Sequence, residues 1–157
     1  DLLMGERTHL LILEGIQDPG NLGTMFRTGE GAGITGIIMN GCADIFAPKT
    51  VRSTMGSICR IPFYVARDLH ETLRGLKEKA IPLYAAHLKG KEYYDAMDYR
   101  KAAAFLIGSE GNGLTEETAA LADIYLKIPM GGQLESLNAA MAAGILMYEV
   151  NRQRRGT

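Results

Sequence analysis

Three clusters of glycine and polar side chains lie far apart in the chain, and each adjoins an apolar run. The first places Asn21 and Gly23 near Arg27, the second is GSEGNGL at residues 108–114, and the third is IPMGGQLESLN at residues 128–138. The third cluster combines the end of an apolar strand pattern, a glycine turn and a Ser/Asn pair at the start of a helical pattern. This combination predicts a small-molecule pocket, because glycines let a ligand approach the backbone while apolar side chains form walls.

The three clusters resemble the three sequence motifs of the SpoU family, also called the TrmH family, of RNA ribose 2'-O-methyltransferases in the SPOUT superfamily. Residues 14–27 correspond to the first motif, residues 108–113 to the second, and residues 128–138 with the following helix to the third. The motifs stand in the family's order. The resemblance implies an enzyme that transfers a methyl group from S-adenosylmethionine to a ribose 2'-hydroxyl in structured RNA, either rRNA or tRNA.

The resemblance also implies a set of donor-binding residues. They are Ala86 after the fourth predicted strand, Gly108 in the second motif, and Ile128, Met130, Gly132 and Leu137 in the third. Methyl transfer to a hydroxyl requires in-line alignment and removal of a proton, and positioning alone supplies part of the barrier reduction. No metal is expected, because the three histidines are far apart and lack clustered ligands.

Five polar residues are implied to carry the chemistry: Arg27, Asn21, Glu110, Ser136 and Asn138. Arg27 takes the central role at the 2'-hydroxyl, although a guanidinium acts poorly as a base at neutral pH. Two versions stay open: Arg27 removes the proton with help from a substrate phosphate, or it only orients the hydroxyl and phosphate. Glu110 is expected to hold Arg27 or nearby backbone, while Ser136, Asn138 and Asn21 orient substrate and arginine. Ser136 is also the predicted N-cap of the last helix.

Alternating strand and helix patterns predict the α/β fold that positions these residues. Six strands are predicted, at residues 9–13, 36–39, 61–65, 81–86, 103–107 and 124–128. Helices are predicted at residues 21–32, 50–55, 69–79, 115–122 and 137–152. This order favours a mainly parallel six-stranded sheet flanked by helices. A C-terminal trefoil knot is implied only by the resemblance, since periodicity does not predict one.

The length of 157 residues and the 46% hydrophobic content predict one methyltransferase catalytic domain over residues 1–157. Family members often carry an additional N-terminal RNA-binding domain, and this sequence begins without Met, so we expect a domain cut from a longer chain. The chain has neither an apolar run long enough to cross a membrane nor a signal-peptide pattern, which predicts a cytoplasmic protein without membrane contact.

The formal net charge of −1 is unusual for an RNA-binding protein, because contacts to phosphate normally dominate such binding. Local positive charge resolves the conflict. Arg52 and Arg60 flank a predicted helix and loop, while Arg152, Arg154 and Arg155 cluster at the C-terminal end. The terminal cluster is equally typical of cations at the end of a helix.

The last predicted helix is rich in small residues between Ala139 and Gly144, so another element can approach it closely. From the residues alone, this helix packs on its own sheet or contacts a second chain. The resemblance favours a homodimer, because family members dimerise through helices near the cofactor site.

Two other functions compete with RNA methylation. A Rossmann-type nucleotide enzyme would use the glycine-rich segments, but neither segment has the G-x-G-x-x-G order directly after a first strand. A non-catalytic RNA-binding module on the same SPOUT fold is disfavoured by the presence of Arg27, Glu110 and Asn138. The sequence does not indicate which RNA or which nucleotide is modified.

Overall fold

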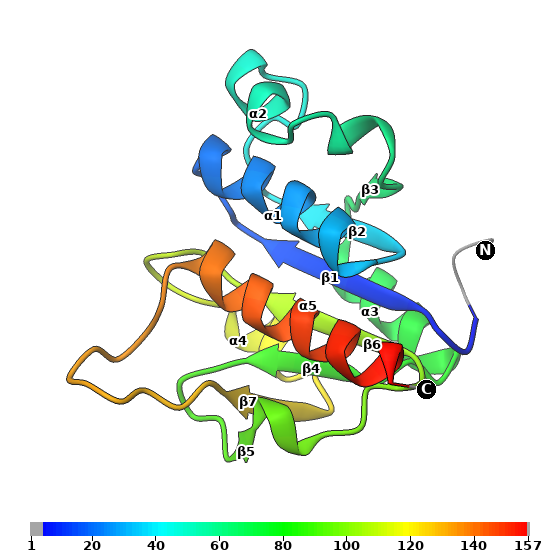
Figure 1. Ribbon diagram of the computed structural model, residues 1–157, viewed down its shortest axis with the longest axis vertical. Coiled ribbons are helices and arrows are strands. Elements are labelled where there is room, and N and C mark those ends of the chain that lie inside the picture. The colour runs from blue at the N-terminus through cyan, green and yellow to red at the C-terminus, as the bar shows by residue number, and fades with distance from the viewer. Residues whose placement is uncertain (1–4, 157) are drawn as a thin grey trace.

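Seven parallel strands form one sheet in the computed structural model, which describes residues 5–156 of the 157-residue chain (Figure 1). The strands are β1 (His9–Glu14), β2 (Gly36–Asn40), β3 (Phe63–Val65), β4 (Leu83–Ala86), β5 (Glu92–Tyr93), β6 (Ala103–Ile107) and β7 (Ile124–Lys127). Their spatial order is β3-β2-β1-β6-β4-β7-β5, and every neighbouring pair is parallel. The predicted parallel α/β sheet is confirmed.

The predicted number of six strands is wrong by one. Each of the six predicted strands is present, and the seventh is β5, which pairs Glu92 and Tyr93 with Leu126 and Lys127 of β7 at the edge of the sheet. Two residues are too few to show the apolar alternation from which a strand is recognised. The sequence pattern therefore could not reveal β5.

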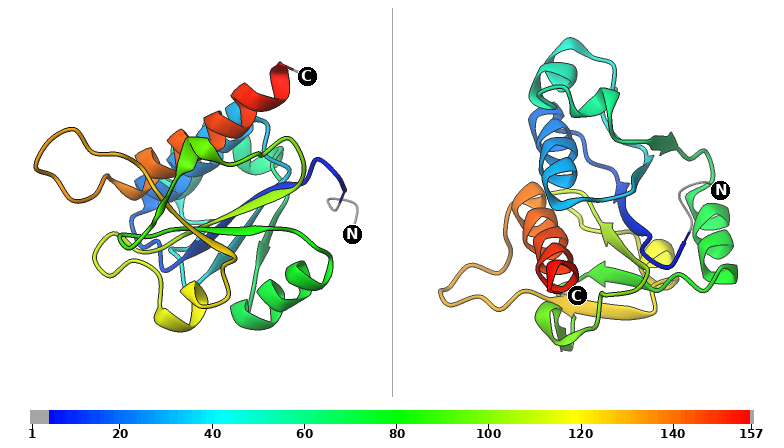
Figure 2. Two further views of the ribbon diagram at one scale, coloured as in Figure 1. Left: turned by 90° about the horizontal axis from the view of Figure 1, so that it is seen from below. Right: turned by 45° about the vertical axis from the view of Figure 1, so that its right-hand side comes forward.

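Helices cover both faces of the sheet. They are α1 (Pro19–Ala32), α2 (Pro48–Ser53), α3 (Leu69–Glu78), α4 (Glu116–Ala119) and α5 (Ala139–Arg155), with short 3-10 helices η1 (Ser57–Cys59) and η2 (Tyr94–Ala96). Helices α1 and α5 lie side by side on one face, while α3 and α4 lie on the other (Figure 2). The result is a three-layer arrangement in which both faces of the central strands are buried.

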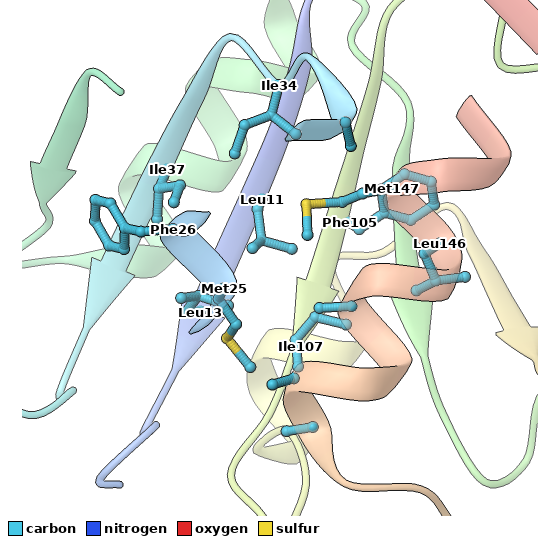
Figure 3. Packing of buried hydrophobic residues seen from close by; sticks show 14 of the residues in the cluster. Leu11, Leu13, Met25, Phe26, Ile34, Ile37, Phe105, Ile107, Leu146 and Met147 are labelled. Atoms are coloured by element: carbon cyan, nitrogen blue, oxygen red, sulfur yellow. The ribbon is translucent and has the colours of Figure 1, made fainter. Parts of the chain in front are cut away.

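Alternate residues of the central strands supply two separate cores. In β1, Leu11 and Leu13 face α1 and α5, whereas Leu10 and Ile12 face α3. Figure 3 shows the first of these cores, where Leu11 lies close to Met147 of α5. Because side chains of a strand point alternately to opposite faces, a strand covered on both faces appears as a continuous apolar run. This explains why β1 was predictable from sequence.

The last helix begins two residues later than predicted, and its N-cap is Asn138 rather than Ser136. Asn138 Oδ1 accepts hydrogen bonds from the backbone N–H of Ala140 at 2.8 Å and of Met141 at 3.2 Å. The prediction of Ser136 as the cap is therefore wrong. Asn and Ser are similarly favoured N-caps, so residue preference alone could not choose between two candidates this close together.

The C-terminal end of α5 is tied to the sheet by Arg154. Its guanidinium donates to the carbonyls of Tyr99 at 3.0 Å, Arg7 at 2.7 Å, Thr8 at 3.2 Å and Lys101 at 2.6 Å. These carbonyls precede β1 and β6, the two strands at the centre of the sheet. Arg154 thereby fixes the direction in which α5 crosses the sheet.

Candidate active site

The carboxyl ends of four adjacent strands bring the three sequence clusters to one edge of the sheet. Strands β1, β6, β4 and β7 are neighbours in that order, and all run in the same direction. The loop after β1 leads into α1, the loop after β6 carries the second cluster, and the loop after β7 carries the third. Ligand sites of open parallel sheets lie at such an edge.

One side chain from each cluster joins a continuous hydrogen-bond chain at this edge. Asn21 Nδ2 donates to Glu110 Oε1 at 2.8 Å, and Asn138 Nδ2 donates to Asn21 Oδ1 at 3.2 Å. The sequence separations are 89 and 117 residues, so only the tertiary fold can bring these groups together. Three of the five predicted catalytic residues therefore meet.

The hydrogen-bond chain has a single direction. Asn138 Oδ1 already caps α5, so Nδ2 is the atom that remains for Asn21. Asn21 accepts through Oδ1 and therefore donates through Nδ2 to Glu110, whose ionised carboxylate can only accept. The backbone N–H of Asn21 is bound in turn by Asp18 Oδ1 at 3.0 Å, at the start of α1. Contacts at the N-termini of α1 and α5 therefore orient the side-chain amides of Asn21 and Asn138.

Packing within the chain requires a glycine at position 108. A Cβ at Gly108 would lie 2.1 Å from the carbonyl carbon of Gly113, across the closed loop of the second cluster. The far end of this loop is held by Glu14, which accepts hydrogen bonds from Thr115 N at 2.8 Å and from Thr118 Oγ1 at 2.5 Å. Glu14 lies inside the first motif, but its type and spacing gave no signal of this role.

The predicted donor-binding residues are distributed along the same edge. Ala86 ends β4, Gly108 follows β6 and Ile128 follows β7, and Ala86 and Ile128 are half-buried against the core. Ala86 and Ile128 therefore offer partly exposed apolar surface at the ends of two neighbouring strands.

The remaining donor-binding candidates lie in the loop of residues 128–138, which extends away from the sheet (Figure 2). Met130 and Leu137 are half-buried, whereas Gly132 is exposed. Leu134 in the same loop is 72% exposed. The loop therefore leaves apolar surface for a ligand or a second chain.

Arg27 stands apart from the hydrogen-bond chain. It follows Asn21 by six residues on α1, which places it about 9 Å further along the helix and about 120° around it. The side chain is exposed and has no hydrogen-bond or ion-pair partner within residues 5–156. Glu110 accordingly binds Asn21 rather than Arg27 within one protomer, and Ser136 is exposed in the loop before Asn138.

Most of the arginines predicted to supply local positive charge are bound inside the protomer. Arg60 pairs with Glu30, Arg152 pairs with Glu149, and Arg154 binds the four carbonyls described above. The other two predicted arginines are exposed. The C-terminal arginines therefore mainly stabilise α5 and its contact with the sheet.

The half-buried Cys42 lies near Glu110 but is unsuited to nucleophilic chemistry. Burial raises the pKa of its thiol, hydrogen bonds to nearby backbone act in the opposite direction, and the charge of Glu110 raises the pKa further. A thiol with a raised pKa stays protonated and unreactive at neutral pH. Within residues 5–156, no group of three potential metal ligands is found, and none of the helices is long and apolar enough to cross a membrane.

Comparisons with known proteins show the family of the chain. A family model described as the SpoU rRNA Methylase family matches residues 8–148. The chain is 38% identical over 142 residues to the 23S rRNA (guanosine(2553)-2'-O)-methyltransferase RlmP of Bacillus subtilis, covering 90% of this chain and 57% of that protein. Across the first three curated relatives, the chain spans 57% to 61% of their length.

Solved structures share the fold. The AdoMet-bound rRNA methyltransferase from Sinorhizobium meliloti superposes with a TM-score of 0.86 at 38% identity, covering 94% of this chain and 57% of that one. The SpoU methyltransferase AviRb from Streptomyces viridochromogenes, in complex with AdoMet, gives a TM-score of 0.92 at 30% identity, covering 98% of this chain and 63% of that one.

Proposed function

Because the chain belongs to the SpoU rRNA methylase family, we propose that it is an S-adenosylmethionine-dependent methyltransferase acting on a ribose 2'-hydroxyl in structured RNA, rRNA or tRNA. The observation that carries the proposal is the hydrogen-bond chain from Asn138 through Asn21 to Glu110, which unites the three motifs at one sheet edge. Relatives described as 2'-O-methyltransferases and neighbours described as AdoMet-bound favour this proposal over a Rossmann-type enzyme or a non-catalytic module.

The donor is proposed to bind along the ends of β4, β6 and β7. Two related structures are described as AdoMet-bound, and the half-buried apolar positions Ala86 and Ile128 fit such a ligand. Gly108, Met130, Gly132 and Leu137 complete the proposed donor-binding set. Bound S-adenosylmethionine supplies an activated methyl group, and the residues of this edge hold it and exclude water.

Arg27 is proposed to act on the acceptor. Its exposed guanidinium has the planar donor fork that binds an RNA phosphate and the 2'-hydroxyl together. Asn21, Glu110 and Asn138 keep the entrances of α1 and α5 in fixed relation, and Ser136 contacts substrate from the loop before α5. Either Arg27 removes the hydroxyl proton with help from the phosphate, or Arg27 orients the hydroxyl and the phosphate while the proton passes to another acceptor.

A homodimer is proposed to complete the site. The small residues Ala139, Ala140 and Ala143 of α5 are buried in the protomer's own core, while Met141 and Tyr148 on the outer face are 63% and 47% exposed. They are seven residues apart and so lie on one stripe of the helix. A second chain on this stripe would cover them beside α1, where Arg27 lies.

The trefoil knot of the family is also proposed for this chain. The path of the chain is compatible with it, since the loop of residues 128–138 leaves β7 and α5 then crosses back to pack beside α1. Single-molecule stretching from both ends tests this directly, because a tightened knot leaves the extended chain shorter than its contour length. A cytoplasmic location is proposed as well.

The chemistry of the modified sugar provides the test of function. Alkaline cleavage of RNA requires a free 2'-hydroxyl, so a 2'-O-methylated nucleotide survives in an alkali-resistant dinucleotide. The chain is incubated with tritiated S-adenosylmethionine and RNA from cells lacking the gene. We expect the label in such dinucleotides at a defined site, whereas label in single nucleotides or none at all would contradict the proposal.

A further inference from the structure

Glu30 is the carboxylate that a neighbouring arginine on α1 would be expected to bind. It follows Arg27 by three residues, and side chains three apart on a helix are neighbours on its surface. Nevertheless, Arg27 has no ion-pair partner among the described residues. Glu30 binds other partners instead.

The segment after α2 holds Glu30 with three donors. Ser57 Oγ donates to Oε1 at 2.6 Å, Arg60 Nη2 donates to Oε1 at 2.9 Å, and Arg60 Nε donates to Oε2. The paired nitrogens of the Arg60 guanidinium match the two carboxylate oxygens, a geometry in which arginine binds more firmly than lysine. The hydrogen bonds from Arg60, followed by that from Ser57, lower the pKa of the Glu30 carboxyl to about 2.

The backbone before η1 leaves room for this contact. Gly56 has a φ of 90°, and a Cβ there would meet Arg60 Nη1 at 3.1 Å. A side chain at position 56 would therefore be strained and would crowd the guanidinium. The close contact between Gly23 and Ser53, where a Cβ on Gly23 would lie 2.2 Å from the Ser53 Cβ, brings α2 against the same face of α1.

Arg27 lies on this face, between the Gly23 contact with α2 and the Glu30 contact with Arg60, because positions four and three apart share a helix face. We propose that Arg60 is a positioning residue that keeps Glu30 away from Arg27, so that the Arg27 guanidinium stays available for an RNA phosphate. The inference rests on the proposed function for its catalytic consequence, but the contact itself can be measured without RNA.

The first measurement follows the Arg27 Nε–Hε resonance by NMR, assigned by its loss in Arg27→Lys. In Arg60→Gln, the released Glu30 should bind Arg27 and shift this resonance. In the double variant Arg60→Gln with Glu30→Gln, the resonance should return to the parental position, because the competing charge is gone. Arg100→Gln is the control, since Arg100 is a similarly exposed arginine that pairs with Asp98, outside α1.

The second measurement is the rate of methyl transfer to RNA. Arg60→Gln should lower kcat by about 1.5-fold to twofold, the scale set by an exposed ion pair on a helix. The double variant should regain parental kcat, whereas a purely structural role of the Glu30–Arg60 pair would leave the double variant as slow as the single one. If Arg60→Gln does not fold, Arg60→Lys with and without Glu30→Gln gives the same comparison.

An unmoved Arg27 resonance in the Arg60 variants, or a shift that persists in the double variant, would overturn the inference. If the parental chain transfers no methyl group to RNA, the proposed function fails, while the resonance still decides whether Arg60 withholds Glu30 from Arg27. The two failures are therefore distinguishable.

Discussion

At the scale of single residues, the site is organised by a hydrogen-bond chain that runs through two amides to one carboxylate. Asn21 is the central member, because it accepts from Asn138 and donates to Glu110. The resemblance identified all three residues, but the order of donation became clear only when the cap of α5 was located at Asn138. Residue types alone leave such an order open, because an amide both donates and accepts.

Replacing Asn21 with Ala should lower turnover about tenfold or more while leaving the fold intact. The variant loses the contact that holds the segments carrying Glu110 and Asn138 in place relative to each other. Thr24→Ala is the control, since Thr24 is exposed one turn further along α1. Steady-state methyl transfer measures both variants. Parental turnover in the Asn21 variant would show that the hydrogen-bond chain has no part in catalysis.

At the scale of elements, the sequence predicted the strands that are buried on both faces, but it missed features that depend on local backbone geometry. The central strands β1 and β6 are apolar on both faces and were predicted within a residue. Strand β5 is too short to show a pattern of apolar residues. The start of α5 depended on whether Ser136 or Asn138 caps the helix. The exposed position of Arg27, away from Glu110, also could not be predicted. Helical spacing places Arg27 on α1, but it does not determine where the loop that carries Glu110 directs its side chains.

The burial of His9 in β1 makes folding sensitive to mild acid. Burial, with repulsion from Arg154, lowers the pKa of His9 from 6.5 to about 3, so the folded state keeps the ring neutral where the unfolded state protonates it. His9 therefore favours folding fully only above about pH 6.5, and this contribution is lost as pH falls towards 3. Between pH 7 and pH 5 the loss is about 2 kcal/mol.

Urea unfolding at both pH values measures this effect. His9→Phe should remove it, so the difference in unfolding free energy between pH 7 and pH 5 should be smaller in the variant than in the parent. Equal differences in the two proteins would show that His9 does not couple folding to protons.

At the scale of the whole molecule, the proposed catalytic Arg27 does not contact the hydrogen-bond chain formed by Asn138, Asn21 and Glu110. The outer stripe of α5 and the extended loop of residues 128–138 both expose apolar side chains near the same edge. The proposed second copy of the chain would cover this apolar surface.

Met141→Glu should dissociate the proposed dimer, because it places a charge on the exposed α5 stripe at its most exposed apolar side chain. Sedimentation velocity at micromolar concentration should report a monomer for this variant and a dimer for the parent. Met55→Glu is the control, since Met55 is 65% exposed but lies outside α5. A parental chain that sediments as a monomer at high micromolar concentration would contradict the dimer.

The most direct test of the central claim compares Arg27→Ala with the parent in two measurements, affinity for S-adenosylmethionine by calorimetry and transfer of tritiated methyl to ribose 2'-oxygen. Arg74→Ala, an exposed arginine on the opposite layer, serves as the control. Donor affinity should stay nearly unchanged and turnover should disappear, with poor rescue by Lys, which lacks the planar fork. Turnover above about a tenth of the parental value, a loss below about 1.4 kcal/mol, would contradict the role of Arg27 in methyl transfer.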